Sequence, residues 1–228
     1  MSRYSTADEV KQEHIDKLGN DLGLLYHELC NEVGWLYLKW EDYVELFGTN
    51  PTRIDLLNKS APVFFRIIQD TLFKDVLLHI TRLTDPPKSL GKKNLTIQCL
   101  PSLVNASISV SVSEHVSDAI EKASFCRDWR NRHIAHSDFN LAMGEQVEPL
   151  EHASHAKVKD ALDSISKVLN VISEFYMQAA VAFDSIGGPG GALDLLYVLD
   201  DGLEADIARS KRIEAGQYLQ EDLKNRNL

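Results

Sequence analysis

The stretch "SAPVFFRIIQDTLFKDVLLHITRLTD" (Ser60–Asp85) decides the fold class of this chain. Apolar residues recur at helical steps around most of its circumference, and its proline stands near the start, where a first-turn position suits proline. The pattern predicts a helix from about Ala61 to Leu83. Because the apolar surface is too broad for a helix with one solvent face, we expect this helix to lie at the centre of an α-helical core.

The flanking segments show the same helical periodicity of apolar residues. We find no alternation typical of strands and no internal repeat of 20 to 50 residues. The chain is therefore predicted to be all-α, with about five to seven helices in a bundle. Besides the central helix, the expected helices span residues 6–47, 52–59, 114–136, 158–183 and 204–224.

A glycine-rich segment, "GGPGG" (Gly187–Gly191), divides the predicted bundle from the end of the chain. It lacks the Gly-Lys-Ser/Thr ending of a phosphate-binding loop, so it is interpreted as a flexible linker. The sequence predicts a helical bundle over residues 1–186, a linker over 187–191 and a C-terminal helical extension over 192–228. We expect the extension to pack on the bundle or on a dimer partner.

Composition limits the classes of function. The 228 residues include 24 basic and 34 acidic side chains, and the formal net charge of -10 argues against general coating of nucleic acid. A local cationic cluster remains compatible with phosphate binding, because phosphates respond to the local field. Three widely spaced cysteines are typical of a reduced protein rather than a disulfide scaffold. With neither a signal peptide nor an apolar membrane span, we expect a soluble cytoplasmic protein without membrane association.

Cations gather in "FCRDWRNRHIAHSDFN" (Phe125–Asn140), where three arginines and two histidines fall between residues 127 and 136. On a regular helix, Arg130 and His136 lie roughly 120° apart around the axis and about 9 Å apart along it. One straight helix therefore does not aim both side chains at one phosphate. Their cooperation requires either a distorted helix end or a second copy of the chain across a two-fold axis.

This set of side chains suits RNA cleavage. A histidine can take the proton of a 2'-hydroxyl or give a proton to the leaving 5'-oxygen. The arginine fork can stabilise charge on the phosphorane oxygens, and Asn131 can orient the phosphate or the histidine. No metal is required by this chemistry. The alternative is structural, since cations in a last helical turn complement the helix dipole by about 0.3–1 kcal/mol each.

The segments "RNRHIAH" (Arg130–His136) and "LLNKSAPVFFRIIQDTLFKDVLLHITRLTDPPKSLGKKNLTI" (Leu56–Ile97) resemble HEPN-domain proteins of the prokaryotic abortive-infection U type. The resemblance implies a helical bundle that forms a homodimer, with two Arg–His motifs facing one cleft. It also implies a metal-independent endoribonuclease of phage defence or toxin–antitoxin systems that leaves 2',3'-cyclic phosphate ends. Arg130 and His136 would then be the catalytic pair and Asn131 the auxiliary polar residue, without any cofactor.

The same resemblance leaves a second function open. Other HEPN domains have lost catalysis and serve as binding or regulatory modules, such as an antitoxin or a partner-binding protein. A nucleotidyltransferase or an antitoxin is the expected kind of protein partner in a two-component system. RNA is the expected substrate in the catalytic alternative.

Further residues are candidates for contacts with RNA. Arg127, Arg132 and His133 could bind flanking phosphates, although Asp128 could instead pair with Arg132 one helical turn away. Lys92 and Lys93, in the loop that also holds Lys88, could extend the RNA-binding surface or simply be solvated.

Three more features have structural and functional interpretations. Trp129 could stack on a base or pack in the core. Asp85 is interpreted as a cap or turn residue before two prolines, with Arg82 as a candidate partner. Glu151, His152 and His155 have helical spacing for a metal, but no further ligand lies nearby in the sequence.

Overall fold

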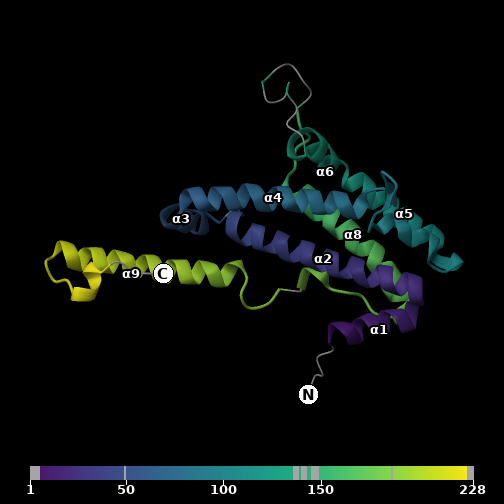
Figure 1. Ribbon diagram of the computed structural model, residues 1–228, viewed down its shortest axis with the longest axis horizontal. Helices are drawn as coiled ribbons and strands as arrows, with labels where there is room; N and C mark the ends of the chain where they lie inside the picture. Colours follow the sequence, from purple (N-terminus) through teal and green to yellow (C-terminus); the bar gives the residue numbers. More distant parts are fainter. Residues whose placement is uncertain are drawn as a thin grey trace. The chain divides into compact units, whose positions relative to one another are not determined.

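The computed structural model describes residues 6–48, 50–135, 139, 143–144, 149–185 and 187–224. Among the described residues, the regular secondary structure is helical apart from one small hairpin, which confirms the all-α prediction. The chain forms two compact units: a larger one, Met1–Trp40 with Phe73–Ile186, and a smaller one, Glu41–Leu72 with Gly187–Leu228. The long helices α2 (Asn20–Phe47) and α4 (Pro62–Thr84) contribute residues to both units (Figure 1). The division at 187–191 stays a prediction.

The N-terminal helix is shorter than predicted. Helix α1 (Ala7–Leu18) begins with a capping box, in which the Glu9 backbone N–H donates to Thr6 Oγ1 at 3.2 Å and the Thr6 N–H donates to the Glu9 carboxylate at 2.8 Å. The helix ends at Gly19, whose φ of 87° lies in the region that favours glycine. The single helix expected over 6–47 is therefore wrong, because Gly19 separates α1 from α2.

Gly23 allows the backbone of α1 to approach α2 closely. A Cβ at this position would lie 2.6 Å from both His14 O and Ile15 Cα. We expect Gly23→Ala to lower the free energy of unfolding by about 1–3 kcal/mol, because backbone atoms cannot move aside as a flexible side chain can. Urea unfolding followed by circular dichroism measures this change.

Gly202→Ala is the matched control for that substitution, because a Cβ there meets no atom within 4 Å. Gly202 lies inside a helix, so alanine should be neutral or should stabilise by up to about 1 kcal/mol. If both variants unfolded at the same urea concentration, close packing at Gly23 would not limit stability.

The core of the larger unit is built from helices of both halves of the sequence. Helix α5 (Ala106–Lys122) packs against α8 (His155–Met177) and against the 3-10 helix η1 (Ile97–Ser102). The central position predicted for α4 holds for its second half, where Val76, Leu77 and Ile80 are completely buried. Its first half is different, since Val63, Phe64 and Ile67 are exposed. Apolar periodicity alone did not separate these two halves.

The smaller unit has its own apolar cluster. Helix α3 (Pro51–Ser60) packs against α9 (Ala192–Glu214). Asp42 Oδ1 accepts a hydrogen bond from the Ala192 N–H at 2.8 Å, which holds the first turn of α9. Helix α9 begins at Ala192 and ends at Glu214, so it starts and ends earlier than the helix predicted over 204–224. The buried cluster consists of Leu46, Leu57, Phe65, Ala192 and Leu196.

The predicted helix over 114–136 is three consecutive elements. Helix α5 starts earlier, at Ala106, where Asn105 Oδ1 accepts from the Ser107 N–H at 2.9 Å. A break at Ala123 precedes α6 (Ser124–Trp129), and a π-helical turn, η2, follows at Arg130–Ile134. The cationic motif therefore lies on a distorted helix end.

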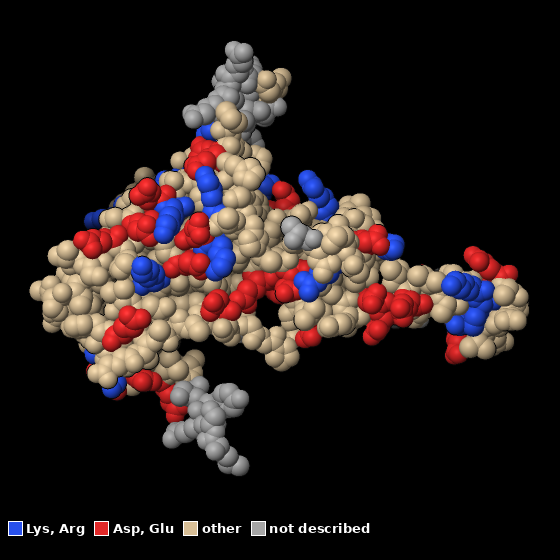
Figure 2. All heavy atoms as spheres, turned by 180° about the vertical axis from the view of Figure 1, so that it is seen from behind, with Lys and Arg blue, Asp and Glu red and all other residues tan. Residues whose placement is uncertain are grey.

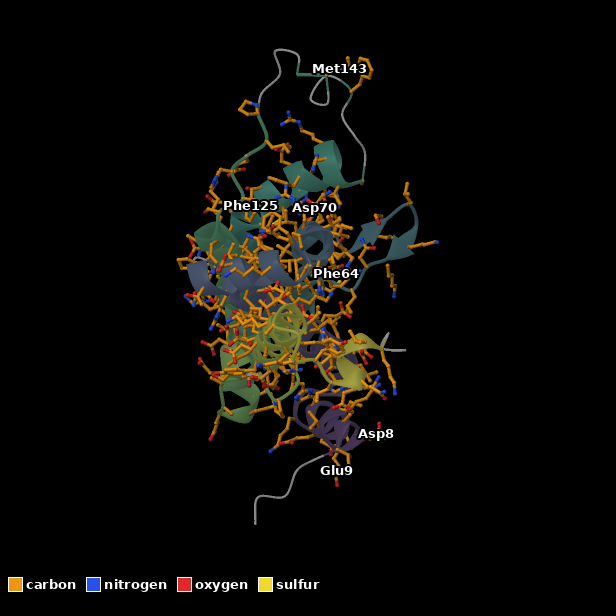
Figure 3. The ribbon with its side chains drawn as sticks, turned by 90° about the vertical axis from the view of Figure 1, so that its left-hand side faces the viewer. Asp8, Glu9, Phe64, Asp70, Phe125 and Met143 are labelled. Carbon is orange, nitrogen blue, oxygen red and sulfur yellow. The ribbon has the colours of Figure 1, made fainter. Side chains whose placement is uncertain are left out.

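A two-stranded hairpin, β1 (Lys88–Ser89) and β2 (Lys92–Lys93), follows α4. Figure 3 shows it as two short arrows with long side chains extending from them. The sequence predicted a loop here, and strands of two residues are too short to show the alternation by which a strand is recognised.

Candidate functional site

The π turn begins at Arg130. The Ala135 N–H donates to Arg130 O at 2.8 Å across five residues, so the turn is wider than in an α-helix. Turns of this kind occur frequently at functional sites. A distorted helix end was one of the two conditions for cooperation between Arg130 and His136. His136 lies outside the described residues, so their pairing stays a prediction.

Arg130 is held by an aspartate from a distant part of the chain. Its Nη1 donates to Asp85 Oδ1 at 3.0 Å and to Oδ2 at 2.8 Å, and its Nε donates to Asn131 Oδ1 at 3.0 Å. The Arg130 and Asp85 side chains are 29% and 22% exposed. Within the described part of the chain, no residue accepts a hydrogen bond from Arg130 Nη2. That group remains able to donate to an anion.

A second arginine reaches the same aspartate. Arg127 Nη2 donates to Thr84 O at 3.1 Å, and its Nε lies 3.8 Å from Asp85 Oδ1. Two guanidinium groups therefore share one carboxylate, which leaves a local excess of positive charge in an acidic chain. On the face shown in Figure 2, acidic and basic side chains are otherwise interspersed, so charge by itself does not outline a nucleic-acid interface there.

Buried polar contacts fix the backbone that carries Asp85. The Thr96 side chain is completely buried, and its hydroxyl oxygen lies 2.9 Å from Leu83 O and 2.7 Å from Asp85 O. Gln98 Nε2 donates to Thr84 O at 2.9 Å. These contacts hold the turn after α4 in place and present the Asp85 carboxylate to Arg130.

The role of Asp85 is the main feature that sequence reasoning missed. Asp85 was interpreted as a cap or turn residue with Arg82 as its candidate partner. Arg82 instead lies 3.7 Å from the carboxylate of Glu32. The available signal was an acidic residue directly after a strongly apolar helix, because a carboxylate that is partly buried beside a core is usually paired with a cation.

Replacing Thr96 with valine tests how firmly this turn is held. Valine has nearly the same shape but donates no hydrogen bond to the carbonyls of Leu83 and Asp85. We expect the free energy of unfolding to fall by about 1–3 kcal/mol, the usual effect of leaving a buried polar group unsatisfied. Chemical denaturation measures the change, with Thr52→Val on the exposed surface of α3 as control. Equal stability of both variants would contradict the prediction.

The remaining cationic candidates have different neighbours. Arg132 lies 3.3 Å from the carboxylate of Asp128, as the helical spacing of the pair allowed. His133 is exposed, and its ring meets that of Trp129 edge to face at 5.5 Å. The structure thus joins Arg127, Arg130 and Asn131 around Asp85, whereas Arg132 pairs with Asp128. The role of each in RNA binding stays a prediction.

Trp129 makes a packing contact and a backbone contact. Its ring lies edge to face with Phe73 at 5.8 Å, and its indole N–H donates to Glu151 O at 2.7 Å. These contacts favour the packing interpretation over base stacking.

His155, one of the residues with helical spacing for a metal, packs against the Trp40 ring at 4.9 Å. Across the described residues, no three His, Cys, Asp or Glu side chains are grouped to hold a metal ion.

Cys126 lies beside the motif but is a poor nucleophile. Burial raises the pKa of its thiol, and the neighbouring Arg127 lowers that pKa by less. The thiol therefore stays protonated at neutral pH, and a thiolate mechanism at this position is unsupported.

Among the helices that the structure describes, none is long and apolar enough to cross a membrane.

The lysines of the hairpin are exposed, and Lys93 borders two cavities that are described below.

Comparison with known proteins identifies the family. The family model HEPN_AbiU2, described as AbiU2, matches residues 19–195. The comparisons with curated proteins and with solved structures found no match. The matched segment covers most of the chain and contains Asp85, Arg130 and the residues to His136. The chain therefore belongs to the AbiU2 family of HEPN-domain proteins, and its all-α fold is a HEPN-like helical bundle.

Proposed function

We propose that this protein is a metal-independent endoribonuclease in which Arg130, Asn131 and His136 act on an RNA phosphodiester. The observation that carries the proposal is the position of Arg130. Its Nε and Nη1 are engaged by Asn131 and Asp85, which fixes the plane of the guanidinium and leaves Nη2 to donate to a phosphate oxygen. Membership of the HEPN family supports the same chemistry.

The proposed reaction needs only the RNA and protein side chains. A neutral His136 takes the proton of the 2'-hydroxyl, and the 2'-oxygen attacks the adjacent phosphorus. The bond from phosphorus to the 5'-oxygen then breaks, and a protonated histidine gives its proton to that oxygen. The products are a 2',3'-cyclic phosphate end and a 5'-hydroxyl end. Arg130 stabilises the negative charge that develops on the phosphorane oxygens.

In this proposal one histidine acts as the base while a second acts as the acid. A second copy of the chain across a two-fold axis supplies the second His136 and a second Arg130. In this proposal the active enzyme is a homodimer of a prokaryotic phage-defence or toxin–antitoxin system. Its protein partner would be an antitoxin or a nucleotidyltransferase.

Cleavage of RNA in the presence of EDTA tests the proposal. We expect the purified protein to produce 2',3'-cyclic phosphate ends, and His136→Ala to lower the rate by about 100- to 10,000-fold through loss of acid–base catalysis. His133→Ala is the matched control, because it removes a histidine of the same motif and should change the rate only a few-fold. An identical RNA pattern from wild type and His136→Ala would assign the activity to a contaminant.

The second candidate function is a non-catalytic binding or regulatory module. Two observations favour it: the Asp85 carboxylate offsets the positive charge of Arg130, and the chain has a net charge of -10. Both weaken attraction to RNA. A protein of this kind would leave RNA intact and would co-purify with one protein partner. A nucleotidyltransferase encoded beside it would favour a two-component pair.

A further inference from the structure

The hairpin after α4 separates its lysines onto two faces. Lys88 lies opposite Lys93 in the antiparallel pair, and Ser89 lies opposite Lys92. Successive side chains of a strand point to opposite faces, and directly opposed residues share a face. Lys88 and Lys93 therefore share one face of the hairpin, and Lys92 belongs to the other.

The opposition of Lys88 and Lys93 is unfavourable in the protein alone. Like charges directly across two strands destabilise the pair. Within the described ranges, neither Lys88 nor Lys93 has an acidic partner within ion-pair distance. An anion bound between the two ammonium groups would remove this repulsion.

The face with Lys88 and Lys93 borders cavities, and Lys92 borders neither of them. The first cavity has a volume of about 300 Å³ and is lined by Arg82, Asp85 and Lys93. The second has a volume of about 650 Å³ and is lined by Lys88 and Lys93 together with Leu25, Gln98, Ser102 and Leu103. Both cavities include Lys93 and Asn94, so they adjoin each other. The first cavity is also lined by Asp85, which binds Arg130. The two adjoining cavities therefore extend from Asp85 to Lys88 and Lys93.

Acidic residues of these cavities have partners of their own. Glu32 lies 2.8 Å from His79 Nε2 and 3.7 Å from Arg82. Asp85 is shared by Arg127 and Arg130. Asp21, in the second cavity, accepts a hydrogen bond from the neutral Asn20 side chain, which does not offset its negative charge. Lys88 and Lys93 border the second cavity without an ion-pair partner among the described residues, so their ammonium groups can bind an anion there.

We propose that the second cavity is a subsite for one nucleotide of single-stranded RNA that flanks the scissile phosphate. Lys88 and Lys93 bind its phosphate, and Leu25 and Leu103 contact the faces of its base, while Gln98 and Ser102 supply polar contacts. The volume lies within the range of small-molecule sites. This subsite rests on the proposed ribonuclease function, since it places a nucleotide of the same RNA beside Arg130.

Binding of a non-cleavable RNA tests the subsite. The probe is a fluorescent 2'-O-methyl oligonucleotide, which lacks the 2'-hydroxyl nucleophile, and binding is followed by fluorescence anisotropy. At about 0.15 M salt, loss of one phosphate contact should weaken binding about 5-fold in Lys93→Ala and should lower the slope of log K against log salt by about 1. Lys92→Ala is the matched control, with the same charge change on the neighbouring residue, and should weaken binding less than 2-fold.

Two competitors distinguish a nucleotide site from an anion site. Adenosine monophosphate should compete with the probe at much lower concentration than inorganic phosphate, because only the nucleotide uses the apolar walls. Adenosine monophosphate should also slow alkylation of Cys99, which lines the same cavity, in wild type but not in Lys93→Ala. Equal competition by the two ligands would overturn the base-binding part of the proposal.

The outcomes separate the subsite from the ribonuclease. Equal weakening by Lys92→Ala and Lys93→Ala, or no weakening by either, overturns the subsite even if wild type cleaves RNA. Conversely, Lys93→Ala could weaken binding more than Lys92→Ala while the wild-type protein cleaves no RNA. That result would support the nucleotide site and contradict the proposed ribonuclease.

Discussion

Arg130→Lys should slow RNA cleavage by about 100- to 1,000-fold, the usual effect of removing one group that stabilises the transition state. Lysine keeps the positive charge, but its single ammonium group cannot replace the planar fork of arginine. In the protein, that fork holds Asp85 through Nη1 and Asn131 through Nε while Nη2 remains to donate. A lysine drawn to Asp85 would have no second nitrogen for the phosphate.

Single-turnover cleavage at saturating RNA measures this effect on the chemical step. Arg132→Lys is the control two residues away, because Arg132 pairs with Asp128 rather than with Asp85. We expect the control to stay within about threefold of wild type, because lysine can keep the ion pair with Asp128 and such a pair contributes at most about 1 kcal/mol. Equal losses in the two variants would show that cleavage depends on the arginines of the motif in general rather than on the position of Arg130, and no loss in Arg130→Lys would show that positive charge alone is sufficient.

Asp85→Asn should separate RNA binding from catalysis. Asparagine keeps one oxygen that can accept from Arg130 but removes the negative charge that Arg127 and Arg130 share. RNA should therefore bind more tightly, because two cations lose their counter-ion. Cleavage should nevertheless slow by on the order of 100-fold, because a misplacement of about 1 Å in a catalytic group has an effect of that size. The expected signature is a lower KM together with a lower kcat.

Asp128→Asn provides the comparison, since it removes the counter-ion of Arg132 in the same motif. It should share the tighter binding and keep kcat within a few-fold of wild type. A faster enzyme with Asp85→Asn would mean that Asp85 restrains Arg130 from the substrate rather than positioning it.

The long helices were predictable because their buried residues recur at helical steps. The start of α5 was missed, since its first turns alternate serine with Ile108, Val110 and Val112, so the apolar residues there do not recur at helical steps. In the structure these serines have backbone partners: Ser113 Oγ donates to Ser109 O at 2.8 Å, and Ser109 Oγ donates to Pro101 O at 2.9 Å. The sequence pattern does not reveal such bonds.

The candidate site was predictable only in its local part. Arg127, Arg130 and Asn131 are close in the sequence, so the cluster was visible without a structure. Asp85 is 45 residues from Arg130, and only tertiary packing brings the two together. The different surroundings of Lys92 and Lys93 could not be predicted from the sequence either. The register of the hairpin decides which lysine faces the cavities.

The wide turn at Arg130–Ile134 also has a consequence for the length of the motif. A π turn contains one residue more than an α turn at the same place along the helix, so it behaves as an accommodated insertion. Deletion of one residue between Arg130 and Ala135 should restore a regular helix without changing where α6 begins. The number of residues between the arginine and the histidine can thus change by one while the helix before them keeps its core contacts.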